Sequence, residues 1–376
     1  MKKNTILGIT SILLAFLLTL LLLELFLQFL PVSNPPSNVP ISPTNPIYRK
    51  EPNKDYINSQ GRFFDIVTKK RSNNYGFINR QDYFPNATSP LLAIIGDSKV
   101  EATQVDDDIT FTGLLQQKVG ENGRIYSFGF GGTQLPMYLA YARYAQQNFH
   151  PDGMVFVIVG NDYDESISTY NNKPNFYFFY PTENATLTWK LNPYQLGIDD
   201  RILRYSALYR YFKNNLNGVA QIEFLRGKMN NLLSSEKTGF NPISIYAGDA
   251  SMHVDHERVQ LSQKGVDEYL RLLPEMTGLP PNKILLVVEG RSYPEELEKS
   301  NSFLVFFDIM REYLMQKARE GGFEIIDLQE AFFEHFKQNH QRFEFPTDAH
   351  WSDVGHQVVA EQIEKSRLFK ELFSRK

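Results

Sequence analysis

The sequence predicts an α/β protein in which a central parallel sheet of five strands is covered by helices on both faces. Short apolar runs end in small or polar residues and are followed by stretches with helical spacing, an alternation typical of parallel sheets. Ligands bind at the carboxyl ends of the strands in such folds, so residues directly after each strand are the first candidates for a site. The predicted strands are Leu91–Ile95, Arg124–Phe128, Met154–Val159, Ile284–Val288 and Glu324–Asp327. Predicted helices include Gln134–Gln147, Ser302–Glu320 and Asp353–Ser366.

Residues 1–30 predict a transmembrane anchor. The apolar run from Ile6 to Leu23 continues to Leu30 and follows two lysines, Lys2 and Lys3. A helix of this length crosses a hydrocarbon layer of about 30 Å, and the lysines predict a cytoplasmic N-terminus with the body on the far side. A cleaved signal peptide is the alternative, but no small-x-small cleavage site follows the run. We therefore expect a single-pass membrane protein with an extracytoplasmic body, periplasmic or at the cell surface.

The rest of the chain divides into a linker and one large domain. Residues 31–46 are rich in Pro, Ser and Asn, which predicts an extended spacer. The domain spans 47–376 and contains an insertion at about 163–281, which is too long for an ordinary connection and rich in aromatic residues. The insertion is either a helical lid over a substrate cleft or helical packing without a role in recognition.

Composition excludes several kinds of function. A formal net charge of -4 gives no basic field, so the sequence predicts no nucleic-acid partner. There is no cysteine, which excludes disulfides, thiolate metal sites and a cysteine nucleophile. Neither the pair His350 and His356 nor the cluster of His253, Asp255 and His256 has the spacing of a closed ligand set, so no metal and no cofactor is predicted.

Side chains suited to acyl transfer follow the predicted strands. Ser98 comes after the first strand, in Gly96-Asp97-Ser98. Gly132, or less favourably Gly131, follows the second strand and Asn161 the third, where a backbone N–H and a side-chain amide can stabilise an oxyanion. Near the C-terminus, Asp348-Ala349-His350-Trp351 places a carboxylate and an imidazole on one face of an extended segment. Together these residues supply a nucleophile, oxyanion donors, a base and a group that orients the base.

These blocks, in this order, resemble the SGNH (GDSL-like) hydrolase family. The resemblance covers roughly residues 47–365 and implies a flavodoxin-like α/β/α sandwich, with Ser98, His350 and Asp348 as catalytic triad and Gly132 and Asn161 in the oxyanion hole. Lys99 departs from the family pattern, which has an apolar residue there. The short Asp-x-His form followed by Trp351 resembles an anchored bacterial branch of exopolysaccharide O-acetyltransferases and acetylesterases.

The resemblance implies a serine esterase or O-acyltransferase that acts outside the cytoplasm on acetyl groups of a carbohydrate polymer. Ser98 would attack the ester carbonyl, and water or a sugar hydroxyl would resolve the acyl-enzyme. The motif does not choose between these acceptors. A lipid or small-ester hydrolase, and a catalytically silent scaffold of an envelope polysaccharide system, are the alternatives. No partner protein is predicted.

Overall fold

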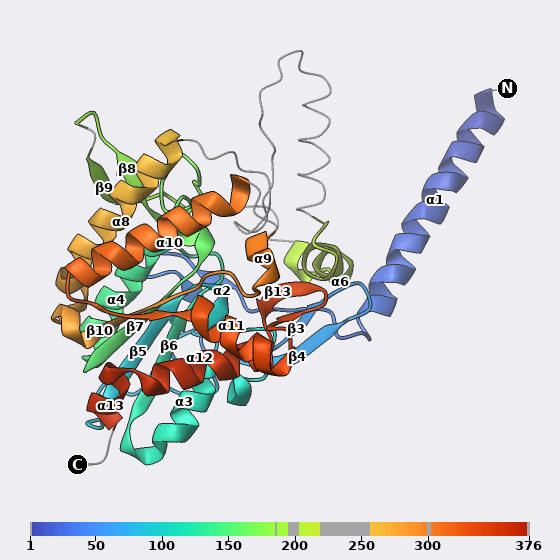
Figure 1. Ribbon diagram of the computed structural model, residues 1–376. Coiled ribbons are helices and arrows are strands. Elements are labelled where there is room, and N and C mark those ends of the chain that lie inside the picture. Colours follow the sequence, from blue (N-terminus) through green and yellow to red (C-terminus); the bar gives the residue numbers. More distant parts are fainter. Residues whose placement is uncertain (1, 185, 195–202, 219–255, 299–301, 374–376) are drawn as a thin grey trace.

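The body of the protein is a three-layer α/β/α sandwich around a five-stranded parallel sheet, as predicted (Figure 1). The computed structural model describes residues 2–184, 186–194, 203–218, 256–298 and 302–373. The order across the sheet is β11-β10-β7-β5-β6, so the first strand of the sheet lies between the second and the third, the flavodoxin-like arrangement. All five strands agree with the predicted runs to within one residue. They are β5 (Leu91–Gly96), β6 (Arg124–Gly129), β7 (Gly153–Ile158), β10 (Ile284–Val288) and β11 (Glu324–Asp327).

Side chains that alternate along the strands fill two apolar layers, one on each face of the sheet. Ala93 and Phe156 lie in one layer, and their neighbours Ile94 and Val157 lie in the other. Figure 1 shows α8 and α10 on one side of the sheet and α3 and α12 on the other. The first layer is covered by α4 (Leu135–Phe149), α8 (His256–Thr277) and α10 (Ser302–Glu320). The second is covered by α3 (Phe111–Val119), α11 (Leu328–Asn339), α12 (Asp353–Lys365) and α13 (Arg367–Phe373).

Two antiparallel pairs that the sequence did not reveal precede the sheet: β1 (Asn38–Val39) with β2 (Arg49–Lys50), and β3 (Lys54–Gln60) with β4 (Ile66–Ser72). The buried face of β4 includes the polar residues Thr68, Lys70 and Ser72, so no apolar alternation marks this strand. Lys70 is buried because its ammonium pairs with Asp107 at 2.6 Å. Residues 31–46, predicted as a linker, contain β1 and a turn closed by Ser42 and Asn45. They are held against the body through β1 and through the buried Asn45, which donates to the Ile47 carbonyl.

The described parts of the insertion combine a β-ribbon with helices. The aromatic stretch near its start forms β8, whose Phe178 and Phe179 are fully buried in the main core. The end of the insertion, α8, packs on α4 as part of a covering layer. Residues 185, 195–202 and 219–255 lie outside the described part. The described elements of the insertion that precede α8 are β8 (Tyr177–Pro181), β9 (Leu187–Leu191), η4 (Leu203–Tyr205), α6 (Ala207–Arg210) and η5 (Tyr211–Asn215). The remaining short elements are α2 (Ser98–Glu101), η1 (Asp107–Ile109), η2 (Gly120–Asn122), η3 (Gly160–Asp162), η6 (Pro281–Lys283), α9 (Glu295–Glu298), β12 (Glu344–Phe345) and β13 (Asp348–Trp351).

The first helix, α1 (Lys2–Leu27), projects away from the body (Figure 1). Within the described residues it is the one helix long and apolar enough to cross a membrane: the candidate span Thr5–Leu27 has 23 residues and reaches a mean hydropathy of 2.8 over 18 of them. A signal sequence would share these properties. Its last turn is docked on the body: the Glu24 carboxylate accepts hydrogen bonds from the Ser206 hydroxyl at 2.7 Å and the Ala207 N–H at 2.8 Å. These contacts fix the end of α1 against α6.

Candidate active site

The structure brings Ser98, His350 and Asp348 together at the carboxyl edge of the sheet. Ser98 begins α2 directly after β5, and His350 and Asp348 lie on β13. The Ser98 hydroxyl is 2.7 Å from His350 Nε2, and His350 Nδ1 is 2.5 Å from Asp348 Oδ1. Ser98 and His350 are 252 positions apart in the chain, so only the fold makes this contact. The arrangement can pass a proton from the serine hydroxyl to a histidine whose other nitrogen is held by a carboxylate.

A second carboxylate lies close to the serine but makes a weaker contact. Asp97 Oδ2 is 3.4 Å from the Ser98 hydroxyl, whereas His350 Nε2 is 2.7 Å away, so the shorter bond directs the hydroxyl proton toward the histidine. Asp97 Oδ1 instead accepts the backbone N–H of Lys99 and caps the turn that carries Ser98. Burial raises the pKa of Asp97. Asp97 is therefore the N-cap residue that stabilises the turn carrying Ser98.

The carboxylate beside the histidine is held in its charged form. Burial alone would raise the pKa of Asp348, but the hydrogen bonds from the His350 ring and backbone, together with the His350 and Lys99 charges, bring the pKa below its ordinary value. The His350 backbone N–H donates to the same oxygen at 2.8 Å. Asp348 therefore accepts hydrogen bonds from both the backbone N–H and the ring of His350. The two bonds together fix the His350 ring with its Nδ1–H toward the carboxylate.

The two glycines proposed as oxyanion donors are placed differently. Gly131 lies beside Ser98, because a Cβ atom added to it would be 3.7 Å from Ser98 Cβ, but its N–H donates to the Glu101 carboxylate at 2.8 Å. Gly132 has a φ of 75°, which favours glycine, and a Cβ atom added to it would be 3.1 Å from the Lys173 ammonium. Glu101 thus holds the turn after β6, a contact that the sequence reasoning missed.

Asn161 lies on η3, directly after β7, as predicted. Burial raises the pKa of the nearby Glu165 carboxyl, and the Asn161 side chain and the Lys173 charge act in the opposite direction. The turn is fixed by the buried Asp162, which accepts hydrogen bonds from the Tyr138 hydroxyl and the Val159 N–H. The end of β7 thus holds Asn161 at the same edge of the sheet as Ser98.

A buried polar lock joins the serine turn to the histidine segment. Lys99, 4% exposed, donates to the Ala349 carbonyl at 2.9 Å and pairs with Glu289 at 3.3 Å. The Trp351 indole N–H donates to the same Glu289 carboxylate at 3.0 Å, and the Lys99 ammonium lies 5.0 Å from the Trp351 ring centroid. These three residues form what we call the Lys99 lock. In the sequence Lys99 stands out only as a departure from the family pattern, whereas Glu289 could have been noticed as a polar residue directly after a predicted strand.

His356, the second histidine of the pair considered for metal binding, lies inside the core. His356 is buried, stacks on Phe111 with ring centroids 5.8 Å apart, and accepts the Phe111 N–H through Nδ1. Burial lowers its pKa to about 3, so it is neutral at ordinary pH. Of the other cluster considered for metal binding, His253 and Asp255 lie outside the described residues.

A cavity of about 250 Å³ lies next to the triad. Its lining includes Asn161 and also Lys99 and Ala349, the chain neighbours of Ser98 and His350. Its lining also contains aromatic rings and charged side chains: Tyr293, Phe307 and Trp351, and Glu289, Arg291 and Glu344. Phe307 covers Gly160 so closely that any Cβ atom there would overlap its ring.

The sequence matches no known family model and no curated protein. Among solved structures, it is similar to LAE5, an alpha/beta hydrolase enzyme from the metagenome of Lake Arreo, at 16% identity over 74% of this chain and 94% of that chain, with a TM-score of 0.38. A member of the lipolytic protein G-D-S-L family from Veillonella parvula is 9% identical over 74% and 98% of the two chains, with a TM-score of 0.38. An acetyl xylan esterase from Geobacillus stearothermophilus is 14% identical over 75% and 96%, with a TM-score of 0.36. With TM-scores below 0.5 these likenesses carry no argument about activity, so function depends on the geometry of the site.

Proposed function

We propose that this protein is a serine-dependent ester hydrolase or O-acyltransferase, and the contact chain from Ser98 through His350 to Asp348 is the observation that carries the proposal. In this mechanism His350 Nε2 takes the hydroxyl proton as Ser98 Oγ attacks the ester carbonyl. His350 then returns the proton to the leaving alcohol, and an acyl-Ser98 ester remains. Water or a second alcohol attacks that ester, again with His350 as base, and releases Ser98.

The oxyanion of each tetrahedral intermediate would be stabilised by three donors: the Ser98 N–H, the Gly132 N–H and the Asn161 amide. Their placement at the ends of the neighbouring strands β5, β6 and β7 supports this assignment. Gly131 would join them only if its N–H left Glu101, to which it now donates.

The substrate class that we propose is an acetylated carbohydrate polymer. The cavity beside the triad supports it, because its aromatic rings suit stacking on sugars and its carboxylates and Arg291 suit hydrogen bonding to hydroxyl groups. A hydrolase for long acyl chains would need a more uniformly apolar cavity. The length and composition of α1 support a membrane-anchored enzyme. Lys2 and Lys3, before the apolar run, support an orientation in which the body lies outside the cytoplasm.

Release of acetate by the full chain in detergent tests this function. Ser98→Ala should lower turnover of an aryl acetate and of acetylated glycans by at least roughly 10³-fold, because the nucleophile is lost. Ser352→Ala is a matched control, since the Ser352 hydroxyl is buried without a hydrogen-bond partner and makes no cap contact. Equal turnover in wild type and Ser98→Ala would contradict the proposal.

The same assay separates the narrower alternatives. Octanoyl esters turned over as fast as acetyl esters would favour a lipid or small-ester hydrolase. An added oligosaccharide that becomes acetylated would identify a transferase, whereas acetate alone would identify a hydrolase.

A further inference from the structure

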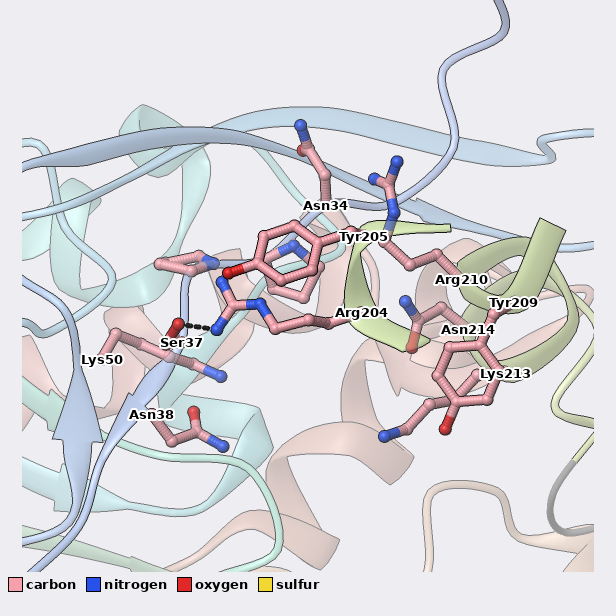
Figure 2. Close-up of a pocket in the computed structure, with 12 residues that line it drawn as sticks. Asn34, Ser37, Asn38, Lys50, Arg204, Tyr205, Tyr209, Arg210, Lys213 and Asn214 are labelled. Atoms are coloured by element: carbon pink, nitrogen blue, oxygen red, sulfur yellow. Dashed lines mark hydrogen bonds between the residues drawn. The ribbon is translucent and has the colours of Figure 1, made fainter. Parts of the chain in front are cut away.

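A second cavity, which contains none of the triad residues, lies between the linker and the insertion (Figure 2). We call it the basic cavity, because its lining includes Lys50, Arg204, Arg210 and Lys213, and none of the described residues that line it is acidic. Its volume is about 330 Å³. Cations gathered in one cavity repel each other, and an anion bound among them would remove this cost.

Two of the cations, Arg204 and Arg210, are held by neutral hydrogen-bond partners from the linker. Burial lowers the pKa of Arg210, and the Glu24 charge acts on it in the opposite direction. Figure 2 shows Arg204 reaching from the insertion to the Ser37 hydroxyl of the linker, to which it donates a hydrogen bond. Arg210 donates to the Ser33 carbonyl at 3.1 Å, while its Nε atom is buried without a hydrogen-bond partner. Burial lowers the pKa of Lys50, and the Lys213 charge lowers it further, against the Glu101 carboxylate, which acts in the opposite direction. Guanidinium and ammonium groups are the donors that phosphate oxygens prefer.

The basic cavity lies just beyond the end of the membrane helix. Glu24, in the last turn of α1, holds the start of α6 through the Ala207 N–H. Arg210 is at the other end of α6, about 4.5 Å further along the helix axis. An apolar cluster of Leu27, Val32 and Ala207 closes the junction. The cavity therefore lies at the height where lipid headgroups meet water if α1 spans the bilayer.

Exposed aromatic residues surround the same junction. Phe29 is 88% exposed at the end of α1, and Tyr205, in the cavity lining, is 71% exposed. Phe63 is 79% exposed next to Phe64, whose ring packs against Tyr211 of the insertion. Aromatic side chains beside cations are typical of the interface between membrane and water.

We infer that the basic cavity binds the phosphate group of an anionic phospholipid at the membrane surface. The inference depends on the proposed membrane anchorage of α1. A soluble phosphate could meet the same cations, but it would give no reason for the exposed aromatic side chains or for the rigid docking of α1 beside the cavity. A bound lipid would fix how the body, and with it Ser98, faces the membrane.

Native mass spectrometry of the full chain released from nanodiscs tests the site. The discs contain phosphatidylcholine alone or with phosphatidylglycerol, and the variant carries Arg204→Gln with Lys213→Gln. The matched control carries Arg319→Gln with Lys337→Gln, which removes the same charge from exposed positions outside the cavity lining. We expect wild type and control to retain phosphatidylglycerol at least several-fold better than phosphatidylcholine, and the cavity variant to lose this preference. Arg204→Lys alone, which keeps the charge, should keep the preference.

Three results would overturn the inference. They are equal retention of both lipids by wild type, equal loss in the cavity variant and the control, and complete displacement of the lipid by inorganic phosphate at the same concentration. Aryl acetate turnover should be unchanged in the cavity variant, so failure of the proposed catalysis in Ser98→Ala is a separate outcome. Release of the wild-type chain by alkaline washing would contradict the anchorage and the lipid site together, without touching the ester chemistry.

Discussion

Ser98 and His350 reach the same site from two regions that are stabilised differently. Ser98 follows β5, a strand inside the sheet whose six residues are all buried. His350 lies on β13, which pairs only with β12 in a two-stranded ribbon outside the main sheet. Apolar packing therefore positions Ser98, whereas the ribbon that carries His350 is positioned by the Lys99 lock, which includes the buried Trp351 ring. Folding stability and catalytic geometry should respond separately to changes in the two regions.

The largest effect on stability is expected in the sheet. Ile94 is fully buried, so Ile94→Ala should lower the free energy of unfolding by about 2–5 kcal/mol, through lost transfer energy and the cavity that remains. Turnover per folded molecule should stay near wild type. Urea denaturation and aryl acetate turnover, measured on one preparation, check both expectations. Ile94→Val is the graded control, at about 1 kcal/mol. If Ile94→Ala lowered the turnover of the folded fraction as much as substitutions in the Lys99 lock do, stability and catalytic geometry would not respond separately.

The second-largest effect is expected in the Lys99 lock, where substitutions should lower turnover more than stability. Lys99→Met with Glu289→Gln removes both charges of the buried pair while a side-chain oxygen remains for the Trp351 indole. Turnover should fall roughly 10–100-fold because the His350 segment loses the bond to Ala349, whereas unfolding free energy should change little. Lys99→Met alone should also destabilise the fold, since Glu289 would stay buried and charged.

An exposed pair provides the control for the lock. Lys118 and Glu364 make a 2.6 Å ion pair between helices, and both side chains are substantially exposed. Lys118→Met with Glu364→Gln should leave turnover and stability near wild type, because exposed pairs contribute little. Equal turnover in the lock variant, the control and wild type would remove the positioning role from Lys99.

The smallest effect is the pH dependence of stability that His356 should cause. His356 has a folded pKa of about 3 against an ordinary value of 6.5, so below pH 6.5 the unfolded chain binds a proton that the native chain does not. Stability is therefore lost as pH falls from 6.5 toward 3, by about 2 kcal/mol at pH 5. His356→Asn cannot titrate there and should flatten the difference in unfolding free energy between pH 7 and pH 5 by about that amount. An unchanged difference would show that His356 does not supply this pH dependence.

The sequence predicted β5, β7 and β10 because burial on both faces makes each strand an apolar run that ends in a small or polar residue. The edge strands β6 and β11 contain polar residues, but each has a short apolar stretch that was enough to predict it. The sequence did not predict β3 and β4 because buried polar residues such as Lys70 and Ser72 remove the alternation that identifies a strand. Lys70 is tolerated there only through its contact with Asp107, 37 positions away. Patterns local in sequence cannot show such compensation.

In the candidate active site, too, residues in local motifs were predicted and contacts between distant residues were not. Ser98, Asp348 and His350 were predicted because each belongs to a short motif with a chemical reason for its spacing. The Lys99 lock was not predicted, because its bond to Ala349 joins positions 250 residues apart and has no local pattern. The contact of Glu101 with Gly131 was missed because a carboxylate on a helical turn is ordinarily exposed to solvent.

The central claim is that His350 activates Ser98, and labelling of the full chain with a fluorophosphonate tests it most directly. The account predicts that wild type carries the label on Ser98, located by mass spectrometry of the modified peptide. It also predicts that Ser98→Ala is unlabelled and that His350→Ala is labelled at least roughly 10²-fold more slowly, although folded. A folded wild-type protein that stays unlabelled, or equal labelling rates in wild type and His350→Ala, would contradict it.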